Sequence, residues 1–380
     1  MLVLSAWWTI RLAWADHLSL SPQLADRQRA VLLAPAASLY NRLADKLEEL
    51  GQDPLPALTQ AAILDPASAE RRMRLGLRLE LARDFPLAER QLLQAASLSR
   101  LYQPRYFLAQ YYFRRQNADA FFRWSRSAFL VAYGDVSPLL DLCWRMHPDP
   151  AWLRQYALPA RPQIARQYLL FLCQRQQMGA AALVAGQISQ TAEAEDLPAL
   201  LEFCDRELAA GSAGPGVEIW NALCKRRLVP FEVLDPENGV SLTDGRFRAA
   251  ALERGFDWHL SATSGLSSQR RFGELAVTFT GHQEEWCPIA WQFIPVRQGA
   301  RYRLQAQIRG VDGTVPTGVC LKVTGLAGAA VPTELRSDGT LTFEAPAEVL
   351  RLSVSYQRPQ GSPRLAGSVS ITEVRLELER

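Results

Sequence analysis

The sequence predicts a multidomain α and β chain, in which an N-terminal α-solenoid of helical hairpins is followed by a C-terminal antiparallel β-sandwich. Three observations lead to this fold class. Short apolar helix ends recur near the length of one helix pair, the apolar pattern changes from helical to alternating after Pro230, and the composition is that of a folded protein. With 380 residues, 48% hydrophobic and 21% charged, the chain is long enough for about two to three domains.

The helical repeat appears as four segments that each open on an alanine, at Ala30, Ala61, Ala95 and Ala128. The intervals between them are close to the roughly 34-residue unit of one helix pair. A second set keeps the same phase and consists of a large residue followed by a small one, at Leu43-Ala44, Leu75-Gly76 and Leu108-Ala109. A small residue lets a neighbouring helix approach closely. We therefore expect hairpins that bury their apolar faces against one another and present an extended groove.

Residues 20–134 resemble degenerate tetratricopeptide repeats. The third unit carries the family's large and small residues at Leu75, Gly76, Leu79, Ala88, Leu92 and Ala95. The resemblance implies a scaffold that holds a protein partner in its groove, without indicating which partner. The helical pattern continues through residues 135–235 as further hairpins, separated by proline or glycine.

Residues 1–19 form an apolar stretch interrupted by Arg11, with the small-x-small sequence Ala13-Trp14-Ala15 near its end. The apolar run is shorter than the roughly 20 residues that span a bilayer. Two interpretations stay open, a truncated signal or membrane anchor and a helix that caps the solenoid. The first places the protein in the cell envelope, either periplasmic or membrane-anchored, and the second is compatible with the cytoplasm.

The C-terminal region, residues 236–380, alternates apolar and polar residues. Tyr302, Leu304, Ala306 and Ile308 alternate with polar neighbours, and the segment 350–356 does the same. This pattern predicts antiparallel strands with one buried face. About eight such strands suit a two-sheet sandwich.

Residues 238–379 resemble the jelly roll of galactose-binding-like and carbohydrate-binding modules, through the segments LTDGRF, GFDWHL and GSVSITEVRLE. Asp244, Gly245 and Phe247 match the first motif of these modules. The last strand reads Ile371-Thr372-Glu373-Val374 where relatives have an Asp-Asp-Val type sequence, and the loss of the first acidic position leaves open whether the structural calcium of some relatives is bound here. The whole architecture is similar to a group of bacterial proteins, many of them acidobacterial, and this similarity implies a role in extracellular polysaccharide assembly or export.

No catalytic, metal or cofactor motif is found in the sequence. The four histidines are scattered, and HExxH, GxSxG and Walker motifs are absent. The net charge of +3 does not indicate a nucleic-acid partner. We therefore expect a non-enzymatic binding protein, and the less favoured alternative is a polysaccharide-acting enzyme with two carboxylates in a cleft.

Two sets of residues are predicted to bind partners. Aromatic rings stack on sugars and polar neighbours bind their hydroxyls, so the glycan-binding candidates are Trp286, Trp258, Trp291, Asp257, Gln283 and Arg309. The candidates for a partner groove in the solenoid are Tyr102, Tyr106, Arg105, Tyr111, Arg114 and Arg115. The alternative for both sets is structural: the aromatics pack in cores, the arginines face solvent, and the sandwich is a cap without a ligand.

The six cysteines show no metal-ligand spacing. Cys143, Cys173, Cys204 and Cys224 lie in apolar helical segments and are expected to fill cores. Cys287 and Cys320 lie in expected strands, and they would form a disulfide if the chain is exported and they come together.

Overall fold

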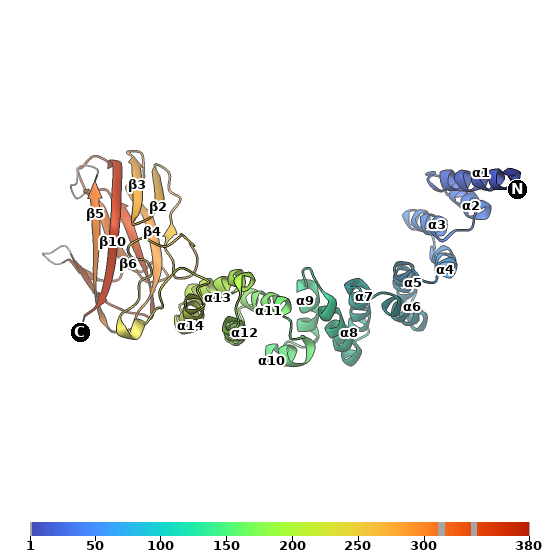
Figure 1. Cartoon of the computed structure of the whole chain (residues 1–380), viewed down its shortest axis with the longest axis horizontal. Coiled ribbons are helices and arrows are strands. Elements are labelled where there is room, and N and C mark those ends of the chain that lie inside the picture. The colour runs from blue at the N-terminus through green and yellow to red at the C-terminus, as the bar shows by residue number, and fades with distance from the viewer. Residues whose placement is uncertain (1, 311–315, 336–339, 380) are drawn as a thin grey trace. The chain divides into compact units, whose positions relative to one another are not determined.

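The computed structural model describes residues 2–310, 316–335 and 340–379, with side chains from Trp7 onward. Helices α1 to α14 come first in the chain and strands β1 to β10 follow (Figure 1). The expected order of an α-helical solenoid and an antiparallel sheet domain is thereby confirmed. The chain divides into two compact units, residues 1–164 and 165–380, and each is described by itself.

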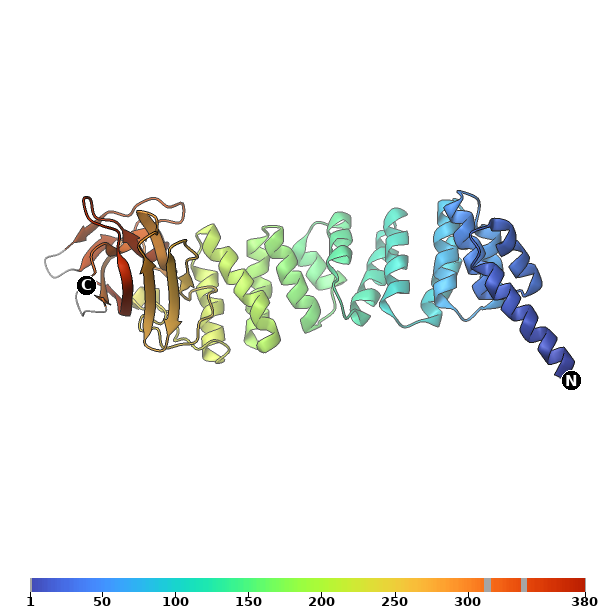
Figure 2. The same ribbon diagram turned by 90° about the horizontal axis from the view of Figure 1, so that it is seen from above.

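The first unit is built from helices that pair as antiparallel hairpins, α1 with α2, α3 with α4, α5 with α6, and α7 with α8 (Figure 2). A short helix and a π-helical turn, Leu153–Ala157, end the unit. The bounds are α1 (Leu2–Ser19), α2 (Leu24–Leu33), α3 (Ala37–Glu49), α4 (Leu55–Leu64), α5 (Ala69–Leu81), α6 (Phe85–Leu98), α7 (Tyr102–Arg114), α8 (Ala118–Val131), α9 (Ser137–Met146) and α10 (Pro150–Trp152).

The residues that revealed the repeat form the contacts between its helices. Ala30, Ala61, Ala95 and Ala128 are all fully buried. In the α5/α6 hairpin a Cβ atom on Gly76 would lie 2.9 Å from Cγ of Leu92, which is closer than carbon atoms normally approach. The small residue after Leu75 is therefore required for the close approach of the second helix, as the sequence pattern predicts.

Helix α1 is the first helix of the array. Its Ala15 is fully buried and belongs to the same core as Val31 of α2 and Leu39 of α3. Arg11 donates a hydrogen bond from Nε to the carbonyl oxygen of Leu33. Within the part of the chain that the structure describes, no helix combines the length and the apolar character needed to cross a membrane.

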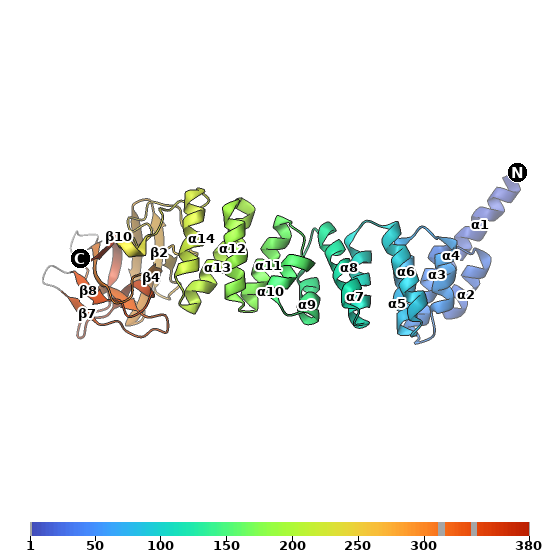
Figure 3. The ribbon, with the colours of Figure 1, turned by 90° about the horizontal axis from the view of Figure 1, so that it is seen from below.

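The second unit contains most of α11 and three further helices, followed by the strands. Figure 3 shows these helices next to the sheets. The helices are α11 (Pro162–Gln174), α12 (Met178–Gln190), α13 (Leu197–Ala210) and α14 (Gly214–Lys225), with short 3-10 turns at Ala194–Asp196 and Pro236–Asn238.

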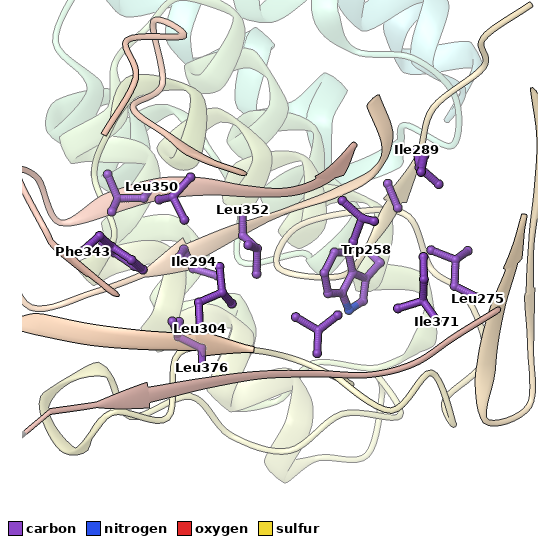
Figure 4. Close-up of a cluster of buried hydrophobic side chains, with 14 of the residues drawn as sticks. Trp258, Leu275, Ile289, Ile294, Leu304, Phe343, Leu350, Leu352, Ile371 and Leu376 are labelled. Atoms are coloured by element: carbon purple, nitrogen blue, oxygen red, sulfur yellow. The ribbon is translucent and has the colours of Figure 1, made fainter. Parts of the chain in front are cut away.

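The strands form two antiparallel sheets, one of four strands in the order β1-β4-β9-β6 and one of six in the order β2-β3-β10-β5-β8-β7. Apolar side chains from both sheets meet in one core, where Trp258 lies among Leu275, Ile289 and Ile371 (Figure 4). The bounds are β1 (His259–Leu260), β2 (Leu266–Arg271), β3 (Glu274–Thr280), β4 (Trp286–Pro295), β5 (Arg301–Gly310), β6 (Val319–Thr324), β7 (Thr333–Leu335), β8 (Leu341–Glu344), β9 (Val349–Gln357) and β10 (Ala366–Leu378).

The expectation that Cys287 and Cys320 could form a disulfide is corrected by the strand order. Cys287 lies on β4 and Cys320 on β6, and β9 runs between these two strands. Two strand spacings separate the cysteines by about 9–10 Å, whereas a disulfide needs Cα atoms within about 7 Å. Both thiols are free.

Candidate functional site

The outer face of the four-stranded sheet carries the most distinctive surface of the sandwich. Along β4, the side chains of Cys287, Ala290 and Ile294 enter the core, whereas those of Trp286, Trp291 and Phe293 do not. The strand register places residues of β9 and β6 beside them. We define the aromatic–cationic face as His259, Trp286, Trp291, Phe293, Lys322 and Arg351.

Trp291 lies between two nitrogen-bearing side chains. His259 of β1 is its register partner across the strand pair, and the two rings stack with their centroids 4.0 Å apart and an interplanar angle of 5°. The guanidinium carbon of Arg351 lies 4.2 Å from the centroid of the Trp291 ring. Phe293 meets the same tryptophan edge to face at 5.0 Å. Planar groups from three strands therefore form one continuous stack.

Trp286 forms the second part of the face. Its side chain is 47% exposed, and the ammonium nitrogen of Lys322 lies 5.2 Å from its ring centroid. Gln357 is the register partner of Trp286, and it lines an open depression of about 420 Å³ between Gly318–Cys320 and Gln357–Gln360. Trp286 thus offers an accessible ring beside a concave surface.

Two polar atoms of the stack, Nε2 of His259 and Nε of Arg351, are buried and have no hydrogen-bond partner. Burial lowers the pKa of His259 and also that of Arg351, because a charged group loses hydration there. An uncompensated guanidinium in a partly dry environment favours the approach of an anion.

The outer face of the six-stranded sheet has a different character. Arg246 and Arg375 both pair with Glu373, Arg303 pairs with Glu379, and Arg301 pairs with Glu334. These cations are neutralised by carboxylates, whereas Arg351 and Lys322 have aromatic rings as their partners. The two faces of the sandwich are therefore chemically distinct.

The structure revises the predicted glycan-binding set. Trp258, Asp257 and Gln283 are fully buried, so they have no surface on which a sugar could lie. Arg309 is exposed on β5, in the other sheet. Of the six predicted residues only Trp286 and Trp291 share one face.

The buried residues of this set have structural partners instead. Asp257 pairs with the guanidinium of Arg270 at 2.7 Å and accepts hydrogen bonds from the backbone N–H groups of Leu252 and Glu253. Gln283 accepts from the N–H of Gly281 and donates to the carbonyl oxygen of Leu365. A buried ion pair or amide of this kind fixes loop geometry.

The sequence did not single out Arg351 and Lys322 as site residues. Their alternation with core residues shows that they leave the core, since Arg351 lies between Leu350 and Leu352. What brings them next to Trp291 and Trp286 is the pairing of β9 with β4 and β6. Strand order is a long-range property that a local pattern does not contain.

The predicted groove residues of the solenoid are mostly engaged within the chain. Arg105 donates to the carbonyl oxygens of Ser99 and Leu101, and the phenol of buried Tyr111 donates to the carbonyl oxygen of Phe85.

The other two arginines of the predicted groove, Arg114 and Arg115, also have partners within the chain. Arg114 forms a two-pronged contact with Glu80, at 2.7 and 2.6 Å. The guanidinium carbon of Arg115 lies 3.8 Å from the centroid of the Phe85 ring. Tyr102 and Tyr106 stack on each other at 5.3 Å and are half-buried. The expected basic, aromatic groove is thus mainly a set of contacts within and between hairpins.

A second surface of the first unit consists of exposed apolar residues. Leu32, Ile63, Leu98 and Leu130 are between 46% and 77% exposed. Each lies in the last turn of a second helix, in α2, α4, α6 and α8 respectively. We call these four residues the hairpin-end row. The buried alanine of each segment lies two or three residues before the exposed one, so the repeat itself places this row.

The described residues contain no group of three His, Cys, Asp or Glu side chains that could hold a metal ion. The acidic residues of two segments that resemble carbohydrate-binding modules in sequence pair with arginine, Asp244 with Arg270 and Glu373 with Arg246.

No protein-family model and no curated protein sequence matches the chain. Among solved structures, one described as a functional characterization of Pseudomonas aeruginosa PilF is similar at 12% sequence identity. The match covers 58% of this chain and 90% of that chain, with a TM-score of 0.28. A similarity of this size carries no argument about function.

Proposed function

We propose that the chain is a non-enzymatic binding scaffold whose helical hairpins hold a protein partner. The supporting observation is the hairpin-end row, in which the last turn of the second helix exposes a large apolar side chain in each of four successive hairpins. Exposed apolar residues that recur in register form an extended surface, and such surfaces serve protein recognition in repeat arrays.

The experiment replaces all four residues of the row by serine in the full chain. Loss of about 100 Å² or more of apolar contact area would weaken the binding of a partner by roughly 2 kcal/mol or more. Leu81→Ser is the matched control, because Leu81 is equally exposed but ends the first helix of its hairpin.

Proteins cross-linked to the chain in extracts of the producing organism are quantified for each variant. A partner captured by the parent chain and by Leu81→Ser, but lost from the four-site variant, supports the scaffold and its surface. Identical capture by all three chains would show that the hairpin-end row is not the partner site.

The second candidate function is glycan binding by the sandwich, and the aromatic–cationic face favours it. Trp286 presents an accessible ring, and C–H groups of a sugar stack on such rings. The burial of Trp258 favours the alternative of a sandwich without a ligand, whereas the exposure of Trp286 opposes it. A glycan-binding sandwich would fit the polysaccharide role that the sequence resemblance implies.

Binding of the full chain to a glycan panel tests this candidate, with Trp286→Ala as the disrupting variant. Phe272→Ala is the control, since Phe272 is an exposed aromatic at the β2–β3 turn. Saturable binding that Trp286→Ala removes and Phe272→Ala retains supports a carbohydrate-binding module. A folded chain that binds no glycan leaves the sandwich as a structural cap.

A further inference from the structure

We propose that the aromatic–cationic face selects acidic glycans, meaning chains whose sugar rings carry carboxylates. This inference rests on the second candidate function above and specifies its substrate class. It follows from the charge of the face, from the partners of its cations, and from the accessible ring beside them.

The charge argument comes from Arg351 and Lys322. Neither cation has a carboxylate partner among the described residues, and the only partner of each is a tryptophan ring. Nε of Arg351 is buried and donates no hydrogen bond. A cation that has lost part of its hydration and gained no counter-charge is stabilised when an anion binds.

The contrast with the other sheet shows that this arrangement is local. Arg303 and Arg375 on the six-stranded sheet are each paired with a glutamate, and Arg246, from the loop before β1, pairs with Glu373 of the same sheet. At the edge of the four-stranded sheet Arg358 also pairs with a carboxylate, that of Glu285. Arg351 and Lys322 have no such partner among the described residues, so at these two cations the counter-charge is left to a ligand.

The ring argument comes from Trp286, whose side chain is 47% exposed, because His259 and Arg351 cover the two faces of the Trp291 ring. An acidic sugar combines one face of C–H groups, which stacks on an aromatic ring, with a carboxylate, which accepts charge-assisted hydrogen bonds from a guanidinium or ammonium. The face places a cation against each of two tryptophans, Lys322 at Trp286 and Arg351 at Trp291. The accessible ring of Trp286 beside Lys322, with Arg351 as a second cation on the same face, matches an acidic glycan better than an acidic peptide, which has charge without a sugar ring to stack.

The experiment measures binding of the full chain by calorimetry to uronate-containing oligosaccharides. Each is compared with its own methyl ester, which keeps the sugar and removes the charge. Poly-glutamate of similar length is a third ligand, and uncharged oligosaccharides form a fourth group. The variants are Arg351→Gln and Lys322→Gln, and the control is Arg309→Gln, an exposed arginine of the other sheet.

We expect the methyl esters to bind at least about tenfold more weakly than the acids, because a charge-assisted hydrogen bond is lost. Arg351→Gln should weaken binding of the acids by about the same factor, with the esters unaffected and Arg309→Gln unchanged. Thermal unfolding of each variant verifies that the fold is retained.

Three results would overturn the inference. Equal binding of acids and esters would leave glycan binding intact and remove the acidic selectivity. Poly-glutamate could bind as tightly as the uronates and with the same dependence on Arg351. This result would show that the face recognises negative charge and not the sugar ring. No binding of any glycan by the folded chain would remove the glycan-binding function itself.

Discussion

The short segment 255–258 carries two aromatic side chains that enter different cores. Phe256 packs edge to face against Trp220 of α14 at a centroid distance of 5.6 Å, whereas Trp258 enters the core between the sheets. The backbone N–H of Gly255 donates to the carboxylate of Asp205 at 2.6 Å. The motif that suggested a carbohydrate-binding module from sequence is therefore a structural junction, and its aromatic residues are not available to a ligand.

Gly255→Ala should destabilise the second unit by about 1–3 kcal/mol. Gly255 has φ of +60°, and a Cβ atom would lie 2.9 Å from Cζ3 of Trp220. Gly299→Ala is the control, because φ is +77° there but no atom lies within 4 Å. Urea unfolding followed by tryptophan fluorescence measures both. If Gly255→Ala and Gly299→Ala lose the same free energy of unfolding, the contact with Trp220 adds nothing to the cost of the backbone strain.

Glu48 of α3 forms ion pairs with Arg74 and Arg78 of α5, and we expect their contribution to stability to depend on pH. Hydrogen bonding to Arg78, with Arg74 nearby, holds the pKa of this carboxyl below its usual value. A lowered folded-state pKa stabilises the protein above the ordinary carboxyl pKa, and that contribution is lost as the pH falls through the folded-state value.

Glu48→Gln should therefore cost up to about 1 kcal/mol at neutral pH, and the difference from the parent chain should vanish between about pH 5 and pH 3. Unfolding midpoints across this range provide the measurement. Glu70→Gln is the control, since Glu70 forms no ion pair among the described residues. A difference that persists at pH 3 would assign the loss to packing.

At the scale of elements, arginine connects the hairpins to each other. Arg72 in α5 donates to the carbonyl oxygen of Pro66, and Arg105 in α7 donates to that of Ser99, each six residues earlier in the chain. These carbonyl groups lie in the turns between hairpins, where the helix pattern leaves them without partners. The guanidinium can serve several acceptors at once, which a lysine cannot do with the same geometry. Such contacts account for part of the high arginine content and explain why Arg105 does not serve a groove.

Arg161→Gln should cost the first unit about 1–3 kcal/mol. Nη1 of Arg161 lies 2.9, 2.8 and 3.0 Å from the carbonyl oxygens of Phe129, Leu130 and Ala132, at the end of α8. Removing the guanidinium leaves these acceptors without their donor. Arg154→Gln, at an exposed position, should change the urea midpoint little. Equal midpoints for the two variants would show that solvent replaces the contacts without cost.

At the scale of the molecule, the last helical hairpin packs against the segment that leads into the sandwich. Trp220 of α14 stacks on Phe231 at 5.3 Å, and Asn221 exchanges two hydrogen bonds with the backbone of Leu234. Arg254 pairs with Asp205 and Glu202 of α13. The change from helical to strand pattern after Pro230 marks a change of secondary structure, whereas the division between the two compact units lies earlier, at residues 164 and 165.

A fragment of residues 192–380 should accordingly be at least about 2 kcal/mol more stable than one of residues 236–380, because the shorter fragment exposes Phe256 and frees Arg254 from its partners. Urea unfolding of both fragments measures the difference. Asp205→Asn in the longer fragment should reduce the difference in stability between the two fragments. Equal stabilities would indicate that the sandwich folds independently of the hairpin.

The sequence by itself determined the order of helices and strands, the phase of the hairpins and the buried alanines, because helical and strand periodicity are local and each residue's burial follows from its own position in the pattern. The tertiary structure decided which aromatic residues are accessible, which arginines remain unpaired, and which strands lie next to each other. These properties depend on residues far apart in the chain: Arg351 meets Trp291 only because β9 pairs with β4, and Cys287 and Cys320 stay apart because β9 lies between their strands.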